Sequence, residues 1–503
     1  MKIFTAAEIQ AWDEYTIREE PVNSIDLMER AAERCVEWIE KNISTFSHFN
    51  IYCGKGNNGG DGLAIARLLA EKGNEVQIHI LEFGFPGTDD FQQNLARLHQ
   101  YPTIQIQYIQ SESHIYPIRE GGVVIDALYG TGLNRKLEGL AAQVVQQINK
   151  SASLVLAIDI PSGLFCDQSS KENATVQADH TLSFTNKLAF YVAENASIIG
   201  QLHLLDIQLH PSFYQYTNSQ LETIEKDSIF QLLKKRNQFS HKGNFGHGLL
   251  IAGSVGKMGA AVLAAQGALR AGIGLLTCQV PGCGYLIMQT CVPEAMVSMD
   301  EKKFHISGFP TSLSPFDSIG IGPGIGQNSE TAALLESLFE KYRKPIVLDA
   351  DALNIISAFP NLLMKIPPHS ILTPHPGEFN RLFGISNTDF DFIELAIQKA
   401  KELEVYIVLK GHHSFIACPS GIHFFNTSGN SGMSRGGSGD VLTGIITSLI
   451  AQGYSPDQAV KIGVFLHGLA GDIAANEHTE QGMRITDLIY SMGAAWKQLI
   501  FKN

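Results

Sequence analysis

The feature that most constrains this chain is a regular alternation of short apolar runs with segments of helical periodicity. In the first half, four apolar runs have the continuous hydrophobic character of parallel strands that are buried on both faces. Helical segments such as 63–71 and 141–149 separate them. This βαβ alternation predicts an α/β domain with a doubly wound parallel sheet. The four runs are 49–53, 75–81, 122–128 and 153–159.

A second α/β series begins at 246–253 and closes with three predicted helices, which start at Gly439, Pro456 and Ile485. Each half opens with a strand that leads into a glycine-rich turn, so the two halves follow a similar logic. Other strands are predicted at 201–207, 272–280, 318–322, 345–350, 370–374 and 405–411.

The length of the chain, 503 residues, exceeds what one hydrophobic core usually supports. The stretch 210–220 is polar, contains a proline and has no periodicity, which is typical of a linker. We therefore expect two fused domains, 1–215 and 225–503, joined near 211–238. A single large α/β barrel is the alternative.

Composition limits the partners of the chain. The formal charge is 37 − 50 = −13 and there is no long run of Lys or Arg, so the overall field repels nucleic acid and anionic membranes, and any phosphate site must be local. The seven cysteines are odd in number and never spaced as C-x-x-C, which argues against a disulfide framework or a zinc site. Such cysteines are typical of proteins of a reducing cytoplasm. We find no secretory signal and no membrane-spanning run. We expect a cytoplasmic homo-oligomer with small-molecule partners.

Residues 54–62, GKGNNGGDG, lie between a predicted strand and a predicted helix. Five glycines in nine positions let backbone N–H groups approach a ligand, and the N-terminus of the following helix adds partial positive charge. This pattern favours a phosphate-binding loop. A tight turn without a ligand is the alternative, because glycine and asparagine also favour turns.

Two aspartates, Asp126 and Asp159, end predicted buried strands in the same half. In an open α/β sheet, ligands bind at the carboxyl ends of the strands, so both aspartates could converge with 54–62 on one crevice. Helix capping is the alternative for either residue. An Asp with apolar neighbours needs a partner to stay charged, and a bound cation or a substrate hydroxyl would serve.

The strongest motif of the second half is GNSGMSRGGSGDVLTGII (429–446). Gly436, Gly437 and Gly439 precede Asp440 at the start of an apolar helix, where backbone N–H groups and the helix dipole stabilise phosphoryl charge. Asp440 would face a substrate hydroxyl, as in a phosphotransferase that activates a hydroxyl group. An N-capping Asp after a flexible turn is the alternative.

Other loops of the second half are weaker signals for a nucleotide site. Lys410 ends a predicted strand beside a glycine, where it could meet a phosphate or simply be solvated. His375 lies between two prolines and is either a ligand or a surface residue. The glycine-rich turns 252–261 and 321–326 also follow strands.

The motifs GKGNNGGDG (54–62), VIDALYGTG (124–132) and AIDIPSG (157–163) resemble, in this order, those of the NAD(P)H-hydrate epimerase family over about the first 210 residues. The resemblance implies that Asp159 performs acid/base chemistry at the carbon that bears the hydroxyl. It implies a potassium ion, K+, held by Asn58, Asp126 and Ser162, whose oxygen atoms suit such a cation. The implied substrate contacts are Asn57, Asn58, Gly59, Gly60, Asp61, Gly130, Thr131, Gly132, Leu133, Asn134, Arg135, Lys136 and Asp159.

The second half resembles the nucleotide-dependent NAD(P)H-hydrate dehydratase family over about residues 225–503. The motifs are AGSVGKMGAA, GIGLLT, IGPGIG, VLDADALN, LTPHPGEFNRL, VLKGHHSFIA, GGSGDVLTGII and FLHGLAGD. The resemblance implies a ribokinase-like fold with Asp440 as a catalytic residue. It implies substrate contacts at Ala260, Gly324, His375 and Asp440, and contacts with the AMP moiety at Lys410, Gly411, His412, His413, Ser414 and Gly439.

The chain as a whole thus resembles bifunctional NAD(P)H-hydrate repair enzymes, with an N-terminal Rossmann-like αβα domain and a C-terminal ribokinase-like α/β domain. Such an enzyme would interconvert the R and S hydrates of NADH or NADPH in its first domain. The second domain would phosphorylate the ring hydroxyl of the S hydrate with ADP or ATP and Mg2+, after which phosphate leaves and NAD(P)H is restored. A small-molecule kinase fused to a dinucleotide-binding module, and a non-catalytic scaffolding role for the first half, are the alternatives.

Two loops depart from the family pattern. Where the dehydratases usually carry a proline and an Ala-Thr pair, this chain has Ser431 and Ser434-Arg435. Where they usually carry a loop that contains Gly or Ala and Thr, it has His412-His413-Ser414. Arg435 could add a phosphate contact or point to solvent. The histidine loop touches the implied nucleotide site, so the choice between ADP and ATP stays open.

Overall fold

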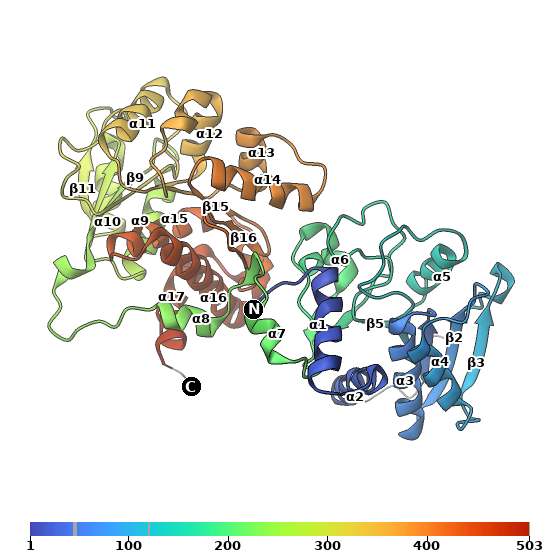
Figure 1. Cartoon of the computed structure of the whole chain (residues 1–503). Helices are drawn as coiled ribbons and strands as arrows, with labels where there is room; N and C mark the ends of the chain where they lie inside the picture. Colours follow the sequence, from blue (N-terminus) through green and yellow to red (C-terminus); the bar gives the residue numbers. More distant parts are fainter. Residues whose placement is uncertain (44–47, 119–120, 502–503) are drawn as a thin grey trace. The chain divides into compact units, whose positions relative to one another are not determined.

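The computed structural model describes residues 1–43, 48–118 and 121–501. These residues pack into two units, each with its own sheet (Figure 1). The N-terminal unit comprises Lys2–Ser219 and Thr388–Phe390, and the C-terminal unit comprises Met1, Gln220–Asn387 and Asp391–Asn503. No described helix is both long and apolar enough to cross a membrane.

The N-terminal unit is built on a seven-stranded parallel sheet in the order β3-β2-β1-β4-β5-β6-β7. Winding reverses between β1 and β4, the position at which doubly wound sheets bind ligands. Helices α2, α3 and α4 cover one face and α5 covers the other. The strands are β1 (His48–Cys53), β2 (Glu75–Leu81), β3 (Gln105–Ile109), β4 (Val123–Ala127), β5 (Leu154–Ile158), β6 (His180–Ser183) and β7 (Gln201–Leu204). The helices are α1 (Ala6–Glu19), α2 (Ser24–Asn42), α3 (Asn57–Glu71), α4 (Asp89–Leu98), α5 (Gly139–Asn149), α6 (Ala196–Ile199) and α7 (Pro211–Tyr216).

The C-terminal unit is built on a ten-stranded sheet in the order β11-β10-β9-β12-β13-β14-β15-β16-β17-β8. The strands from β11 to β15 are parallel, whereas β16 is antiparallel to both of its neighbours. The strands are β8 (Leu221–Thr223), β9 (His247–Ile251), β10 (Leu275–Val280), β11 (Met296–Met299), β12 (Ser318–Ile321), β13 (Ile346–Leu348), β14 (Ile371–Leu372), β15 (Tyr406–Leu409), β16 (Ser414–Ala417) and β17 (His423–Asn426).

Apolar helices bury the faces of this second sheet. Helix α15 packs along α9, and both lie against the strands near the centre of the sheet. Helices α11 to α14 gather on the opposite side of the sheet (Figure 1). The helices are α8 (Lys226–Leu232), α9 (Met258–Arg270), α10 (Tyr285–Cys291), α11 (Ser329–Lys341), α12 (Ala350–Ala358), α13 (Pro376–Phe383), α14 (Asp389–Glu402), α15 (Ser438–Ala451), α16 (Pro456–Gly482) and α17 (Ile485–Ile500).

The strand predictions and the α/β class are confirmed, but one local prediction is wrong. The motif 54–62 is not a loop throughout, because α3 begins at Asn57 rather than near residue 63. The stretch 210–220, predicted as a linker, contains the division between the units at Ser219 and Gln220 and also α7, whose Phe213 stacks on Trp12 of α1 with 5.7 Å between ring centroids. Aromatic packing therefore gives this polar segment a fixed structure.

Candidate active sites

The N-terminal unit has a cavity of about 1350 Å³ at the carboxyl ends of β1, β4 and β5, where the winding of the sheet reverses. The loops that follow these strands supply most of the residues predicted for the substrate. Those that line the cavity are Asn57, Asn58, Asp61, Gly130, Thr131, Gly132, Leu133, Asn134, Arg135 and Asp159. Gly59, Gly60 and Lys136 are not among the lining residues, and Lys136 forms an ion pair with Glu172 at 2.5 Å.

The glycines of the first motif pack the chain together more than they contact a ligand. A Cβ atom on Gly59 would lie 1.8 Å from the carbonyl oxygen of Gly54, and one on Gly62 would lie 2.6 Å from Cβ of Ala127. These glycines let α3 start close against β1 and β4. The N-terminus of α3, with Gly56 as its N-cap, therefore reaches the cavity and brings its partial positive charge there.

Asp159 is held at the end of β5 by three side-chain interactions and by an unusual backbone conformation. Its φ of 68° lies in the left-handed region, which a residue other than glycine rarely adopts. Oδ2 accepts hydrogen bonds from the backbone N–H and the hydroxyl of Thr131 at 2.9 and 2.6 Å, and Oδ1 pairs with Nζ of Lys187 at 2.8 Å. Burial alone would raise the pKa of Asp159, but the Lys187 ammonium and the Thr131 donors lower it. Asp159 is therefore a carboxylate in the folded protein.

Lys187 was not predicted, although it is the ion-pair partner of Asp159. Its side chain is fully buried, and its ammonium also donates to the hydroxyl groups of Ser183 and Thr185 at 2.7 and 3.0 Å. No recognised motif contains Lys187. A lysine directly before the apolar run 188–193 was the one available signal, and that signal is weak.

Of the three residues predicted to hold K+, Asn58 lines the cavity from the first turn of α3, Asp126 lies near the end of β4, and Ser162 lies in the loop after β5. The Asp126 carboxylate accepts from the backbone N–H and the hydroxyl of Ser162 at 2.7 and 2.6 Å. The side-chain amide of Asn58 is buried, and neither of its polar atoms has a hydrogen-bond partner in the described chain. A buried carbonyl oxygen without a partner suits a cation, so the donor set fits the ion. In the described ranges, no group of three His, Cys, Asp or Glu side chains is arranged to hold a metal.

The C-terminal unit has two cavities that share the turn before α15, because Gly436 lines both of them. The first, about 490 Å³, is lined by Ala260, Gly324 and Asp440, which were predicted to bind substrate. The second, about 560 Å³, is lined by five of the six residues predicted for the nucleotide, Lys410, Gly411, His412, Ser414 and Gly439. His375 also lines this second cavity and so lies with the nucleotide residues rather than with the predicted substrate residues.

Lys410 is not simply solvated but anchors a charged cluster at the start of α15. Its Nζ lies 2.8 Å from Oδ1 of Asp349 and 3.9 Å from Oε2 of Glu378. Oδ2 of Asp349 accepts from the hydroxyl of Thr443 at 2.8 Å. A Cβ atom on Gly439 would lie 3.1 Å from Nζ, so this glycine allows the helix to begin against the ammonium group. The motif VLDADALN contained Asp349, but we did not single it out.

Asp440 lies in the first turn of α15 and has a raised pKa. Burial and the nearby Asp349 carboxylate raise the pKa of Asp440 to about 6, and Lys410 offsets part of this effect. A carboxylate whose pKa lies near neutrality is suited to accept a proton. Asp351, which also lines the first cavity, pairs with Lys257 at 3.2 Å and accepts from the backbone N–H of Gly326 at 2.9 Å.

Two departures from the family pattern receive a structural account. The guanidinium of Arg435 donates to the backbone carbonyls of Gln481 and Glu480 at 2.6 and 3.4 Å, so it ties the turn to the end of α16. His413, also predicted to contact the AMP moiety, is not among the residues that line the second cavity. Burial lowers the pKa of His413 to about 4, so this side chain is neutral near pH 7.

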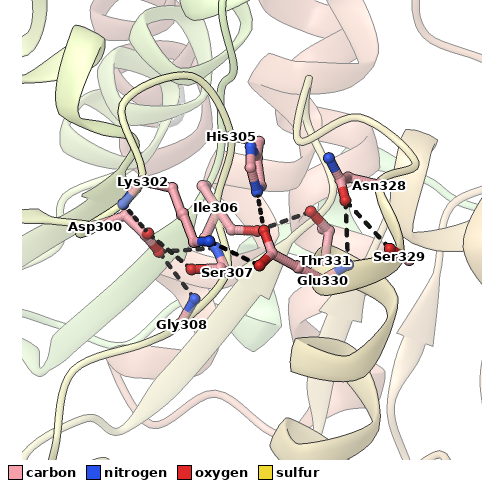
Figure 2. Close-up of polar contacts among 10 residues, drawn as sticks. All are labelled: Asp300, Lys302, His305, Ile306, Ser307, Gly308, Asn328, Ser329, Glu330 and Thr331. Atoms are coloured by element: carbon pink, nitrogen blue, oxygen red, sulfur yellow. Dashed lines mark hydrogen bonds and ion pairs between the residues drawn. The ribbon is translucent and has the colours of Figure 1, made fainter.

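A loop after β11 supports the glycine turn of the first cavity. Figure 2 shows the Asp300 carboxylate, which accepts hydrogen bonds from the backbone N–H groups of Ser307 and Gly308 at 2.9 Å each. In the same loop, the carbonyl of Phe304 accepts from the backbone N–H of Val255, in the turn before α9, at 2.9 Å. The loop thus fixes the turn that leads to Ala260.

The fold of the two units and their cavities together define the class of enzyme to which the chain belongs. The chain is a two-unit α/β enzyme with a doubly wound N-terminal unit and a C-terminal unit in which a glycine turn and an aspartate open a helix at the active site. A family model described as NAD(P)H-hydrate dehydratase matches residues 248–492, and one described as YjeF-related protein N-terminus matches residues 24–189.

Two curated relatives match nearly the whole chain. A bifunctional NAD(P)H-hydrate repair enzyme of Moorella thermoacetica is 35% identical, over 97% of this chain and 95% of the relative. One of Escherichia coli is 31% identical, over 93% of this chain and 88% of the relative. The chain belongs to the family of bifunctional NAD(P)H-hydrate repair enzymes.

Solved structures confirm the ribokinase-like fold of the C-terminal unit. An ADP/ATP-dependent NAD(P)H-hydrate dehydratase from Bacillus subtilis, co-crystallised with ATP/Mg2+, is 30% identical with a TM-score of 0.50 and covers 55% of this chain and 98% of its own. A ribokinase-like superfamily protein of Enterococcus faecalis is 27% identical with a TM-score of 0.50, over 56% of this chain and 98% of its own.

Proposed function

We propose that the two activities of this repair enzyme are divided between the two units. The N-terminal unit interconverts the R and S hydrates of NADH and NADPH, and the C-terminal unit uses ADP or ATP to dehydrate the S hydrate. The observation that carries this division is that each unit has its own cavity lined by its own partly buried aspartate, Asp159 in one and Asp440 in the other.

In the C-terminal unit, the hydrated ring is assigned to the first cavity and the nucleotide to the second. Asp440 takes the proton of the ring hydroxyl while the terminal phosphoryl group transfers to the hydroxyl oxygen. Phosphate then leaves with the C–O bonding pair, a proton leaves the adjacent ring carbon to solvent, and the electrons of that C–H bond restore the double bond. The glycine turn and the N-terminus of α15 stabilise the phosphoryl charge. Asp349 holds Lys410 in place to meet the nucleotide phosphates.

Two ions belong to this proposal. Glu378, which lines the first cavity, is a carboxylate able to hold the Mg2+ that would accompany the nucleotide and offset phosphate charge. Asn58, Asp126 and Ser162 would hold K+, which would supply a positive charge beside the substrate of the N-terminal unit. Replacing K+ with tetramethylammonium should slow epimerisation and leave dehydration of the S hydrate unchanged. Equal rates of epimerisation in both salts would contradict the ion site.

The test of the division uses purified protein, separated R and S hydrates of NADH, and ADP or ATP. Recovery of reduced-cofactor absorbance measures dehydration, and chromatographic separation of the epimers measures epimerisation. Asp440→Asn should abolish recovery and leave epimer exchange intact. Asp159→Asn should have the reverse effect. Equal loss of both activities in each variant would refute the division, and a stable phosphorylated product would indicate a kinase instead.

We also propose that the enzyme acts in the cytoplasm as a homo-oligomer. All seven cysteines are free thiols, five of them buried, which suits a reducing compartment. Self-association stays a prediction, and sedimentation velocity at several protein concentrations tests it.

A further inference from the structure

Helix α1 forms one wall of the cavity in the N-terminal unit. The residues of α1 that line the cavity recur at spacings of three and four, so they share one face of the helix. Most of them are small, apolar or neutral, and Glu14 is exposed and accepts a hydrogen bond from Gln10 at 3.0 Å. Asp13 is the half-buried carboxyl group on this wall. The lining residues of α1 are Ala6, Ala7, Ile9, Gln10, Asp13, Glu14 and Ile17.

The start of α1 is tied to the segment that carries Lys187. Phe4 forms a parallel β-bridge with Lys187, and the backbone N–H of Phe4 donates to the carbonyl of Asn186 at 2.9 Å. The backbone N–H of Ala6, in the first turn, donates to the carboxylate of Asp167 at 2.9 Å. The wall that carries Asp13 is therefore fixed relative to the ion pair of Asp159 and Lys187.

Asp13, Asp61 and Asp159 are three of the carboxyl groups that line this cavity. The buried ammonium of Lys187 pairs with Asp159, whereas the side-chain carboxyl groups of Asp13 and Asp61 have no hydrogen bond to any residue that the structure describes. Burial, and then the charge of Asp159, raise the pKa of Asp13 to about 7; Lys187 offsets part of this, and Glu14 adds to it. The pKa of Asp61 is raised by burial and by the charges of Asp159, Asp13 and Asp90. Near pH 7, the site therefore combines a carboxylate with a carboxylic acid.

We propose that Asp13 is the general acid of epimerisation, paired with Asp159 as the base, a role that rests on the proposed epimerase function of this unit. Hydration of the enamine in a reduced nicotinamide ring places the hydroxyl on the carbon bonded to the ring nitrogen. The two epimers differ at that carbon, so exchange requires its C–O bond to break and to form again on the opposite face.

The step balances without any other reactant. The Asp13 carboxyl donates its proton to the hydroxyl oxygen, the C–O bond breaks, and water leaves with the bonding pair. The lone pair of the ring nitrogen forms a C=N bond, and the Asp159 carboxylate stabilises the resulting cation. Water then adds to the opposite face, the C=N pair returns to nitrogen, and the proton of the added water passes to Asp159. Exchange with solvent resets the two carboxyl groups, and the reverse reaction exchanges their roles.

The experiment follows conversion of the R hydrate of NADH into the S hydrate by the full chain, with the nucleotide omitted so that dehydration does not consume the product. Asp13→Asn should lower kcat about 100-fold or more, with a much smaller change in KM, because general acid catalysis contributes on that order. Wild-type kcat should fall as the pH rises through about 7, where Asp13 loses its proton, and this fall should be absent in Asp13→Asn.

Two further variants separate catalysis from folding. Asp13→Glu retains an acid on the same wall and should restore part of kcat and the fall above pH 7. Glu19→Gln removes a carboxylate from the exposed end of α1, outside the cavity, and should match wild type. Thermal unfolding shows whether each variant folds.

An Asp13→Asn protein that folds and keeps wild-type kcat and pH dependence overturns the assignment, and so does failure of Asp13→Glu to restore activity in a folded protein. If wild type itself does not exchange the epimers, the proposed epimerase function fails instead. The two failures are therefore distinguishable.

Discussion

At the scale of single residues, both sites use a strained backbone to aim carboxylates. Asp159 has φ 68° after β5, and Ala350 has φ 47° after β13, between Asp349 and Asp351. A left-handed conformation in a residue other than glycine costs on the order of 1–2 kcal/mol. In the N-terminal unit the strained residue is Asp159 itself. In the C-terminal unit it is Ala350, which has an aspartate on either side. In both units the packing of the strand end against its loop sustains the conformation.

The ion pair of Asp159 and Lys187 yields a prediction for stability. Lys187→Met leaves the Asp159 carboxylate buried without its cation, which should destabilise the N-terminal unit by about 3–5 kcal/mol. Adding Asp159→Asn to Lys187→Met removes the unpaired charge, so the double variant should be more stable than Lys187→Met alone. Urea unfolding followed by tryptophan fluorescence measures both, since Trp12 and Trp38 report on this unit. Additive losses would contradict the coupling.

Asp440 yields a prediction for pH dependence. In the proposed mechanism Asp440 acts as a base, so its active form is the carboxylate, and burial together with Asp349 raises its pKa to about 6. The kcat/KM for the S hydrate should therefore rise with pH through about 6 and level off above it. Stopped-flow recovery of reduced-cofactor absorbance between pH 5 and about 8 measures this. A profile without a rise near pH 6 would exclude Asp440 as the base that titrates.

At the scale of elements, glycines set how closely helices approach their neighbours. In α15, a Cβ atom on Gly444 would lie 1.9 Å from the carbonyl oxygen of Ala264 in α9, whereas one on Gly493 in α17 would meet nothing within 4 Å. The contact between α15 and α9 positions the turn at Gly436 to Asp440. Gly444 is therefore required for close helix packing, whereas Gly493 has no packing role and only lowers the helix propensity of α17.

Substitution by alanine should separate these two cases. Gly444→Ala forces α15 away from α9 and should destabilise the C-terminal unit by about 1–3 kcal/mol or more. Gly493→Ala removes a flexible residue from an exposed helix position and should stabilise the unit by about 0.5–1 kcal/mol. Chemical denaturation of both variants, compared with wild type, measures the difference. Shifts of the same sign would show that helix propensity, not packing, governs both sites.

Elements differ in how far the sequence predicts them. Strands such as β1 and β4 are continuous apolar runs and were predicted, whereas β3 reads QIQYI, in which polar residues hide a sheet-edge strand. The motifs predicted Asp159 and Asp440 because glycines and strand ends accompany them. Asp13 and Lys187 were not predicted, because neither lies in a glycine-rich motif or at the end of a predicted strand. Only the packing of α1 and of the segment after β6 brings them to the cavity.

At the scale of the whole molecule, the division of labour predicts that inactive variants complement each other. Asp159→Asn retains dehydration and Asp440→Asn retains epimerisation, so an equimolar mixture should convert the R hydrate completely to NADH when a nucleotide is present. Either variant alone should not. The assay is recovery of absorbance from pure R hydrate. Failure of the mixture, with both single activities intact, would show that the S hydrate does not pass between chains.

The wall that the two cavities of the C-terminal unit share at Gly436 has a consequence for the order of turnover. In the proposed assignment the hydrate and the nucleotide occupy separate cavities, so neither has to leave before the other can do so. Binding and release should then be random rather than compulsory in order. The repaired cofactor should inhibit competitively against the hydrate, and the spent nucleotide should inhibit competitively against the fresh one.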